Sequence, residues 1–236
     1  MRAPDGKMHL SYDTGAFLMS LVLRTLARWR VWGLERVPRR GPLILVANHV
    51  SFVDPPILAA SLPRRITFMG KEELFRSPPS RLFFTAMEVF PVRRGRPHRE
   101  ALRRAQAVLE AGGVLGMFPE GRRSPTARIQ PGETGTALLA LHTGAPILPV
   151  GLWGTHQIRD VASLFNRPTV NVSVGEPFSL EREGGRKPSL ERLTQEIMES
   201  IARLLPPISS LPGYPQGEAE RQPLAATTRR EGHHGH

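Results

Sequence analysis

Residues 42–56 read PLILVANHVSFVDPP and join an apolar run to a polar loop and a helix start. The run Pro42–Ala47 is short and unbroken, which predicts a strand buried on both faces of a sheet. Asp54 followed by Pro55 is typical of a helix start, so we expect a helix from Asp54 to about Ser61. A buried strand that leads through a short loop into a helix indicates an α/β fold.

The same alternation of strand and helix continues along the chain. Further strands are predicted at residues 65–69, 114–118, 146–150 and 169–174. Further helices are predicted at residues 97–111, 133–142 and 189–204. Strands separated by helical segments favour a single α/β domain, with a mixed or mostly parallel sheet flanked by helices.

An amphipathic helix is predicted near the N-terminus, from Gly15 to Trp32. The apolar side chains on one stripe are Leu18, Val22, Leu26, Trp29 and Trp32, and the arginines beside it are Arg24, Arg28 and Arg30. Two interpretations are open: a helix packed on the core, or a helix in the membrane interface with its Trp rings at headgroup depth. We therefore divide the chain into a membrane-interface segment at 1–33 and a main domain at 34–205. Residues 206–236 are rich in Pro, Gly and charge and are predicted to form a disordered tail.

The charge of the chain favours an anionic partner. Its 236 residues include 32 basic and 21 acidic side chains, for a net charge of +11. Such an excess suits nucleic acid, an anionic membrane surface or a phosphorylated substrate. The absence of cysteine excludes disulfides, thiolate metal sites and a cysteine nucleophile. No apolar run reaches the ~20 residues that span a bilayer, and the N-terminal stretch makes a poor signal peptide.

Chemically active side chains follow the first buried strand. His49 comes where the chain reaches the sheet edge at which α/β folds place their sites, and Asp54 lies five residues on. A loop of this length can bring the carboxylate against one imidazole nitrogen and leave the other to accept a proton from a hydroxyl. The alternatives are that Asp54 only caps the helix and that His49 is an ordinary loop residue. A triad centred on Ser51 is disfavoured, because the chain has no G-x-S-x-G elbow.

A second polar block, FPEGRRS at 118–124, also follows a predicted strand and should emerge at the same sheet edge. Gly121 permits a tight turn. Arg122 or Arg123 can hold a phosphate through two parallel hydrogen bonds. Glu120 can hold an arginine or a substrate hydroxyl. The competing interpretation is a solvated charged turn.

Two more blocks complete a recognisable pattern. FPVRRG at 90–95 supplies guanidinium groups, and ILPV at 147–150 is an apolar strand. Together with NHVSFVD at 48–54 and FPEGRRS at 118–124, in this order and spacing, they resemble the phospholipid/glycerol acyltransferase family. MGKEELF at 69–75 resembles the lysine-bearing segment of that family.

The resemblance covers about residues 34–156 and implies a role for each matching residue. His49 is the implied general base and Asp54 its partner. The residues implied to contact the glycerol-phosphate part of the acceptor are Arg94, Glu120, Gly121 and Arg123. The sequence departs from the family pattern in two places: Arg122 stands where a small hydroxyl residue is usual, and Gln130-Pro131-Gly132 lacks the lysine often seen before that glycine. Both departures concern the acceptor headgroup more than the reaction.

The implied reaction moves a fatty acyl group from acyl-CoA or acyl-carrier protein to the free hydroxyl of a lysophospholipid. The first candidate acceptor is 1-acylglycerol-3-phosphate, which gives phosphatidic acid in phospholipid synthesis. Lys71 is a candidate for stabilising the oxyanion. No cofactor, metal or nucleic-acid partner is expected. The enzyme is expected at the cytoplasmic face of an anionic membrane, as a peripheral or monotopic protein.

Two functions of other classes remain open from the sequence. A basic nucleic-acid-binding protein would also explain the net charge of +11, although only 6% of residues are aromatic and no nucleic-acid-binding motif is present. A catalytically silent lipid-binding module would keep the same apolar and basic features without the chemistry.

Overall fold

The computed structural model describes residues 7–92, 99–180 and 189–207. The strands in these ranges are β1 (Arg28–Trp32), β2 (Leu43–Ala47), β3 (Ile66–Lys71), β4 (Val89–Val92), β5 (Val114–Met117), β6 (Ile147–Trp153) and β7 (Thr169–Val174). The α-helices are α1 (Lys7–Leu26), α2 (Asp54–Ser61), α3 (Pro78–Ala86), α4 (Arg99–Glu110), α5 (Gly135–Thr143) and α6 (Leu190–Ala202). Short 3-10 helices occupy η1 (Leu34–Arg36), η2 (Glu72–Phe75), η3 (Thr155–Gln157) and η4 (Ala162–Asn166).

The strands form one sheet in the order β1-β7-β6-β2-β5-β3-β4. Neighbouring strands run parallel, except that β6 and β7 are antiparallel. The predicted α/β class with a mostly parallel sheet is confirmed. Because β2, β3, β5 and β6 run the same way, the loops that follow them leave from one edge of the sheet, called here the carboxyl edge.

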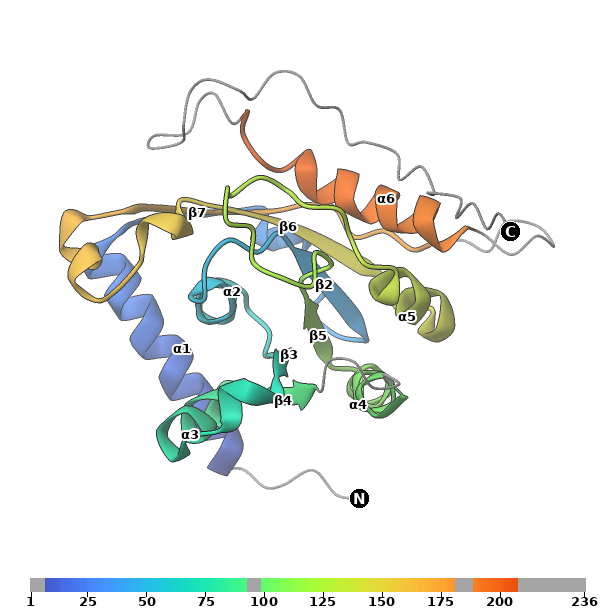
Figure 1. Ribbon diagram of the computed structural model, residues 1–236, viewed down its shortest axis with the longest axis horizontal. Coiled ribbons are helices and arrows are strands. Elements are labelled where there is room, and N and C mark those ends of the chain that lie inside the picture. Colours follow the sequence, from blue (N-terminus) through green and yellow to red (C-terminus); the bar gives the residue numbers. More distant parts are fainter. Residues whose placement is uncertain (1–6, 93–98, 181–188, 208–236) are drawn as a thin grey trace, which may run out of the picture. The chain divides into compact units, whose positions relative to one another are not determined.

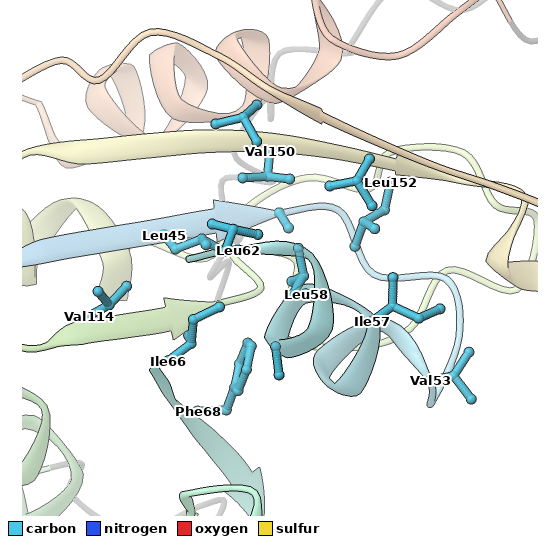
Figure 2. Close-up of a cluster of buried hydrophobic side chains, with 14 of the residues drawn as sticks. Leu45, Val53, Ile57, Leu58, Leu62, Ile66, Phe68, Val114, Val150 and Leu152 are labelled. Carbon is cyan, nitrogen blue, oxygen red and sulfur yellow. The ribbon is translucent and has the colours of Figure 1, made fainter. Parts of the chain in front are cut away.

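The central strand β2 is buried on both faces, as its unbroken apolar run predicts. Leu43, Leu45 and Ala47 belong to the core on one face of the sheet, and Ile44 and Val46 belong to the core on the other. This alternation follows from the two-residue period of a strand. Figure 2 shows the first core, where side chains of α2 meet those of β2, β3, β5 and β6.

Helices cover the two faces of the sheet in separate layers. Helices α1 and α2 cover one face, and α4, α5 and α6 cover the other (Figure 1). Side chains of the first two helices complete the first core, and those of the other three complete the second. The stripe predicted on the last helix is confirmed, since Leu193, Ile197 and Ile201 of α6 are all buried. Two elements that the sequence did not predict are α3 and β4, whose prolines at 78, 79 and 91 read as breakers.

The helix predicted from Gly15 to Trp32 is wrong in its last third. Helix α1 ends at Leu26, and Arg28–Trp32 forms β1, which pairs in parallel with β7. The physical reason is that RWRVW alternates polar and apolar side chains, so that in a strand Trp29 and Val31 pack against the core. The sheet therefore starts before residue 34, and the predicted boundary between 33 and 34 is misplaced.

The two tryptophans of the predicted membrane stripe belong to the sheet. Trp32 stacks on Trp153 of β6, with ring centroids 5.7 Å apart, and the Arg24 guanidinium lies over the Trp29 ring. Within the described ranges, no helix is both long and apolar enough to cross a bilayer. The tail predicted at 206–236 lies outside the described residues, apart from its first two.

Candidate active site

The loop after β2 brings His49 and Asp54 into direct contact. His49 Nδ1 lies 2.8 Å from Asp54 Oδ2, and the same oxygen accepts the backbone N–H groups of Val50 and Ser51, each at 2.8 Å. The Asp54 side chain is fully buried, whereas 18% of the His49 side chain is exposed. The contact expected from the five-residue spacing is therefore present at the carboxyl edge.

Asp54 is not a helix cap. The N-cap of α2 is Val53, and the Asp54 carboxylate turns back toward the loop that precedes it. Because a carboxylate only accepts, His49 donates its Nδ1–H, and this fixes the ring tautomer. The Nε2 atom of His49 is then the nitrogen that can accept a proton.

Aromatic rings hold the face of the His49 imidazole. The ring stacks on Phe118 with centroids 4.1 Å apart and planes 20° apart, and Phe118 stacks in turn on Phe68 at 5.9 Å. Gly116 of β5 makes room for this stack, because a Cβ there would lie 2.3 Å from the Phe68 ring. No role for these aromatic rings was predicted from the sequence, although Phe118 lies at the end of a predicted buried strand.

Asn48 fixes the start of the His49 loop to the neighbouring strand. Its side-chain amide donates to the Leu152 carbonyl of β6 and accepts the Leu152 N–H, both at 2.8 Å. Asn48 is 2% exposed, so both bonds are shielded from water. The asparagine before His49 therefore has a positioning role that the sequence analysis missed.

The loop after β5 reaches the same place and grips the backbone of His49. Glu120 is 3% exposed; its Oε1 accepts the His49 N–H at 2.9 Å, and its Oε2 accepts the Gln130 N–H at 3.1 Å. The Ser124 N–H donates to the His49 carbonyl at 2.7 Å. Both Glu120 oxygens thus accept backbone N–H groups of the protein, and a contact between Glu120 and the acceptor stays a prediction.

Burial raises the pKa of Glu120 to about 7. The two backbone N–H groups that it accepts act in the opposite direction, because they favour the charged form. The nearby Asp54 charge raises this pKa further and the Arg122 charge lowers it. A carboxyl group with such a pKa changes its charge near neutral pH.

Two of the predicted cationic residues follow a tight turn in the loop after β5. Gly121 has φ 65° and donates its N–H to the Phe118 carbonyl at 3.0 Å, which closes a tight turn that favours glycine. Arg122 and Arg123 follow this turn with exposed side chains. Lys71 is exposed at the end of β3, and Arg94 lies outside the described residues.

The described site offers acid–base chemistry and cations. Across residues 7–92, 99–180 and 189–207, no three His, Asp or Glu side chains converge in the way that metal ligands do. The arrangement can remove a proton at His49 Nε2 and attract an anion with the two arginines of the 118–124 block.

Sequence comparison agrees with this geometry. The model of the family described as Acyltransferase matches residues 28–153, which span β1 to β6 and contain both loops of the site. The chain belongs to the Acyltransferase family. The match begins at β1, in agreement with the finding that the sheet of this acyltransferase fold starts before residue 34.

Curated relatives of this acyltransferase family member differ in length. A chloroplastic 1-acyl-sn-glycerol-3-phosphate acyltransferase of Brassica napus is 32% identical over 153 residues, which cover 63% of this chain and 44% of that protein. The 1-acyl-sn-glycerol-3-phosphate acyltransferase of Bacillus subtilis is 27% identical over 197 residues, which cover 82% of this chain and 96% of that protein. The chain thus spans less than half of the plant relative and nearly all of the bacterial one.

A solved structure shares the fold. The crystal structure of the 1-acyl-sn-glycerophosphate acyltransferase of Thermotoga maritima superposes with a TM-score of 0.62 at 24% identity, covering 84% of this chain and 79% of that one. At this identity the comparison supports the architecture, and the function has to be argued from the site.

Proposed function

We propose that this protein transfers a fatty acyl group from a thioester to the free hydroxyl of a lysophospholipid. The observation that carries the proposal is the 2.8 Å contact between His49 Nδ1 and Asp54 Oδ2. It lies at the carboxyl edge of the sheet, on the loop that also meets the arginine-bearing 118–124 block. The first candidate acceptor is 1-acylglycerol-3-phosphate, which gives phosphatidic acid.

The reaction needs a base more than it needs a nucleophile on the protein. A thioester carbonyl is already activated, so the acceptor hydroxyl attacks it once His49 Nε2 removes the hydroxyl proton. The new C–O ester bond forms, the C–S bond breaks, and the thiol leaves with the proton returned by His49. Asp54 stabilises the transient imidazolium, because its buried carboxylate already contacts Nδ1.

Positively charged side chains bind the anionic part of the acceptor. Arg94 and Arg123 are the proposed phosphate ligands, with the tight turn at Gly121 bringing the backbone close. Lys71 at the end of β3 is the proposed oxyanion stabiliser. Acyl-CoA and acylated acyl-carrier protein both provide the thioester, and the mechanism requires neither a cofactor nor a metal.

An exposed apolar face supports a membrane-bound acceptor. We define the apolar face by the exposed side chains of α1 and of the neighbouring η4 segment: Phe17, Leu18, Leu21, Val161 and Phe165. Helix α1 ends at the carboxyl edge and leads into the start of β1. The start of β1 lies beside the start of β7, which in turn lies beside the end of β6. Arg24 of α1 and Arg159, which lies two residues before Val161, are both exposed. Apolar side chains with arginines beside them suit the surface of an anionic bilayer, and the cytoplasmic leaflet is the proposed location.

The proposal is tested by thiol release with both donors. Purified protein is mixed with acyl-CoA or with acylated acyl-carrier protein, and with vesicles that contain 1-acylglycerol-3-phosphate. We expect thiol release that requires the acceptor and disappears in His49→Ala. Binding to the vesicles without thiol release would instead identify a silent lipid-binding module. A shift of nucleic acid at matched salt, again without thiol release, would favour the nucleic-acid-binding alternative.

A further inference from the structure

The carboxyl group of Glu120 is unusual because it is buried without a cationic partner among the described residues. Its side chain is 3% exposed, and among the residues that the structure describes no lysine or arginine forms a salt bridge with it. Burying an ionised carboxylate is costly unless hydrogen bonds compensate. The two bonds that compensate are both from backbone N–H groups, those of His49 and Gln130.

These bonds join two segments that are far apart in the sequence. His49 belongs to the loop after β2, and Gln130 lies at the far end of the loop after β5. The Glu133 N–H donates to the Pro119 carbonyl at 2.8 Å, which closes the second loop at its base. With the bond from Ser124 N–H to the His49 carbonyl, the peptide groups on both sides of His49 are held by this loop.

We propose that Glu120 is a positioning residue that couples acceptor binding to the general base. Glu120 bonds the loop after β5 to His49, and the same loop carries Arg122 and Arg123. An anion bound to these arginines and the His49 imidazole are therefore held by the same loop. A shift of this loop moves the His49 imidazole relative to the acceptor hydroxyl. The inference rests on the proposed function for its substrate, whereas the connection itself rests only on the hydrogen bonds.

The connection is complete when Glu120 is ionised, because a protonated carboxyl offers one good acceptor fewer. The charged groups that face Glu120 are Asp54, which opposes ionisation, and Arg122, which favours it; the His49 ring stacks on Phe118, two residues before Glu120. With a pKa of about 7, Glu120 gains its proton as the pH falls through neutrality. Acyl transfer should then lose the contribution of this connection.

The test compares Glu120→Gln with Glu133→Gln. The substituted amide places an N–H₂ group against a backbone N–H, so one connection is lost at nearly constant side-chain volume. Glu133 is an exposed carboxylate on the same loop and serves as the matched control. We expect Glu120→Gln to lower kcat and raise the acceptor KM together, with kcat/KM down about 10- to 100-fold, because small misplacements of reacting groups have effects of this size. The control should stay within about twofold of wild type.

The pH profile separates positioning from simple structural support. In wild type, kcat/KM should fall as the pH falls through about 7, the pKa of Glu120, and Glu120→Gln should show a smaller fall over the same range. Circular dichroism melts at pH 8 identify a variant that is merely unfolded, and Glu120→Asp then serves as the second variant, since it keeps the charge but reaches only one N–H. Wild-type kcat, KM and pH slope in both Glu120 variants would overturn the proposal.

A second measurement tests the connection without relying on acyl transfer. If wild type transfers no acyl group, the backbone amide signals of His49 and Gln130 still report the connection by ¹⁵N–¹H NMR. We expect both signals to titrate together near pH 7 in wild type and neither to do so in Glu120→Gln. Independent or absent titration of the two signals in wild type would overturn the coupling, whatever the reaction.

Discussion

The active-site loops and the outer side of α1 depart from the usual distribution of side chains in opposite directions. The loops bury two carboxylates, those of Asp54 and Glu120, although acidic side chains are mostly exposed. Helix α1 exposes Phe17, Leu18 and Leu21, although its other side buries Leu23 in the core. One region places charge where water is absent, and the other places apolar surface where water is present.

The difference shows how each region obtains its stability. The buried carboxylates accept hydrogen bonds from within the protein, so their geometry is complete before any ligand arrives. The exposed apolar side chains gain nothing until another apolar surface covers them. Variants of the first region should therefore change chemistry, and variants of the second should change where the chemistry takes place.

The largest effect is expected at His49. His49→Ala should lower kcat by about 10²- to 10⁴-fold, the range for loss of a general base, with little change in thermal stability because part of the ring is exposed. Thiol release and circular dichroism melting measure the two quantities. Retention of wild-type kcat would exclude the general-base role.

Asp54→Asn sharpens the same point. The amide oxygen can take the place of Oδ2, while the amide nitrogen takes the place of Oδ1, which has no hydrogen-bond partner among the described residues. The loop geometry should therefore survive while the negative charge is lost, and kcat should fall less than in His49→Ala. Full activity of this variant would reduce Asp54 to a structural role.

The next effect concerns Glu120 and the pH dependence of stability. Because the pKa of Glu120 is about 7 in the folded protein and 4.5 for an ordinary glutamate, the folded state binds more protons between these pH values. The preference of the folded state for protonated Glu120 therefore contributes to stability. This contribution is complete below pH 4.5 and is lost as the pH rises to about 7. It amounts to about 3 kcal/mol, since one pKa unit corresponds to about 1.4 kcal/mol.

Thermal melts across this range measure that contribution. Relative to Glu120→Gln, wild type should lose several degrees of Tm between pH 5 and pH 8, at about 2–4 °C per kcal/mol for a chain of this size. Glu133→Gln should keep the wild-type slope, because its carboxylate is exposed. Equal slopes for wild type and Glu120→Gln would show that the Glu120 carboxyl is not perturbed by burial.

A smaller effect is expected on the apolar face. The double variant Phe17→Ser/Leu18→Ser should bind anionic vesicles about 10- to 100-fold more weakly, because each side chain contributes only part of the ~1.5–3 kcal/mol of full burial. Both side chains are more than half exposed, at 66% and 54%, so the fold should be retained. Leu138→Ser is the matched control, since Leu138 is 46% exposed on α5 in the opposite layer. Similar loss in both variants would exclude a specific membrane contact at α1.

Point substitutions are needed here because truncation cannot isolate the membrane role. Removing residues 1–32 would also remove β1 and the buried Tyr12 and Leu23. The Tyr12 hydroxyl accepts the Ile66 N–H at 3.0 Å, so α1 is bonded to β3 as well as packed on the core. Loss of the fold is the expected result of that truncation.

The smallest expected effect is at the exposed arginines. Arg123→Ala should raise the acceptor KM about 10-fold and leave the donor KM unchanged, since a charge-assisted hydrogen bond from an exposed side chain contributes about 1.5 kcal/mol, the low end of the usual range. Arg122→Ala is the comparison, because both side chains are exposed on the same turn. We expect the same acceptor-specific effect for Arg94→Ala. Equal changes in both KM values would contradict the assignment to the acceptor phosphate.

Local features of the site followed from the sequence because the interacting residues are neighbours. The contact between His49 and Asp54 spans five residues, and a short loop between a strand and a helix leaves few ways to fold. The unbroken apolar run of β2 and the stripe on α6 were also readable, since each has the period of its element.

Tertiary structure alone decided the partners of two segments, residues 28–32 and the loop that carries Glu120. RWRVW became a strand rather than the end of a helix because β7, more than 130 residues away, offered an edge for it to pair with. The Glu120 carboxylate lies 71 residues from His49 in the chain, and only the parallel pairing of β2 with β5 brings the two loops together. The residues that carry the chemistry could thus be identified from short stretches of sequence. The hydrogen bonds that hold them together, and the apolar face, depend on contacts between distant segments.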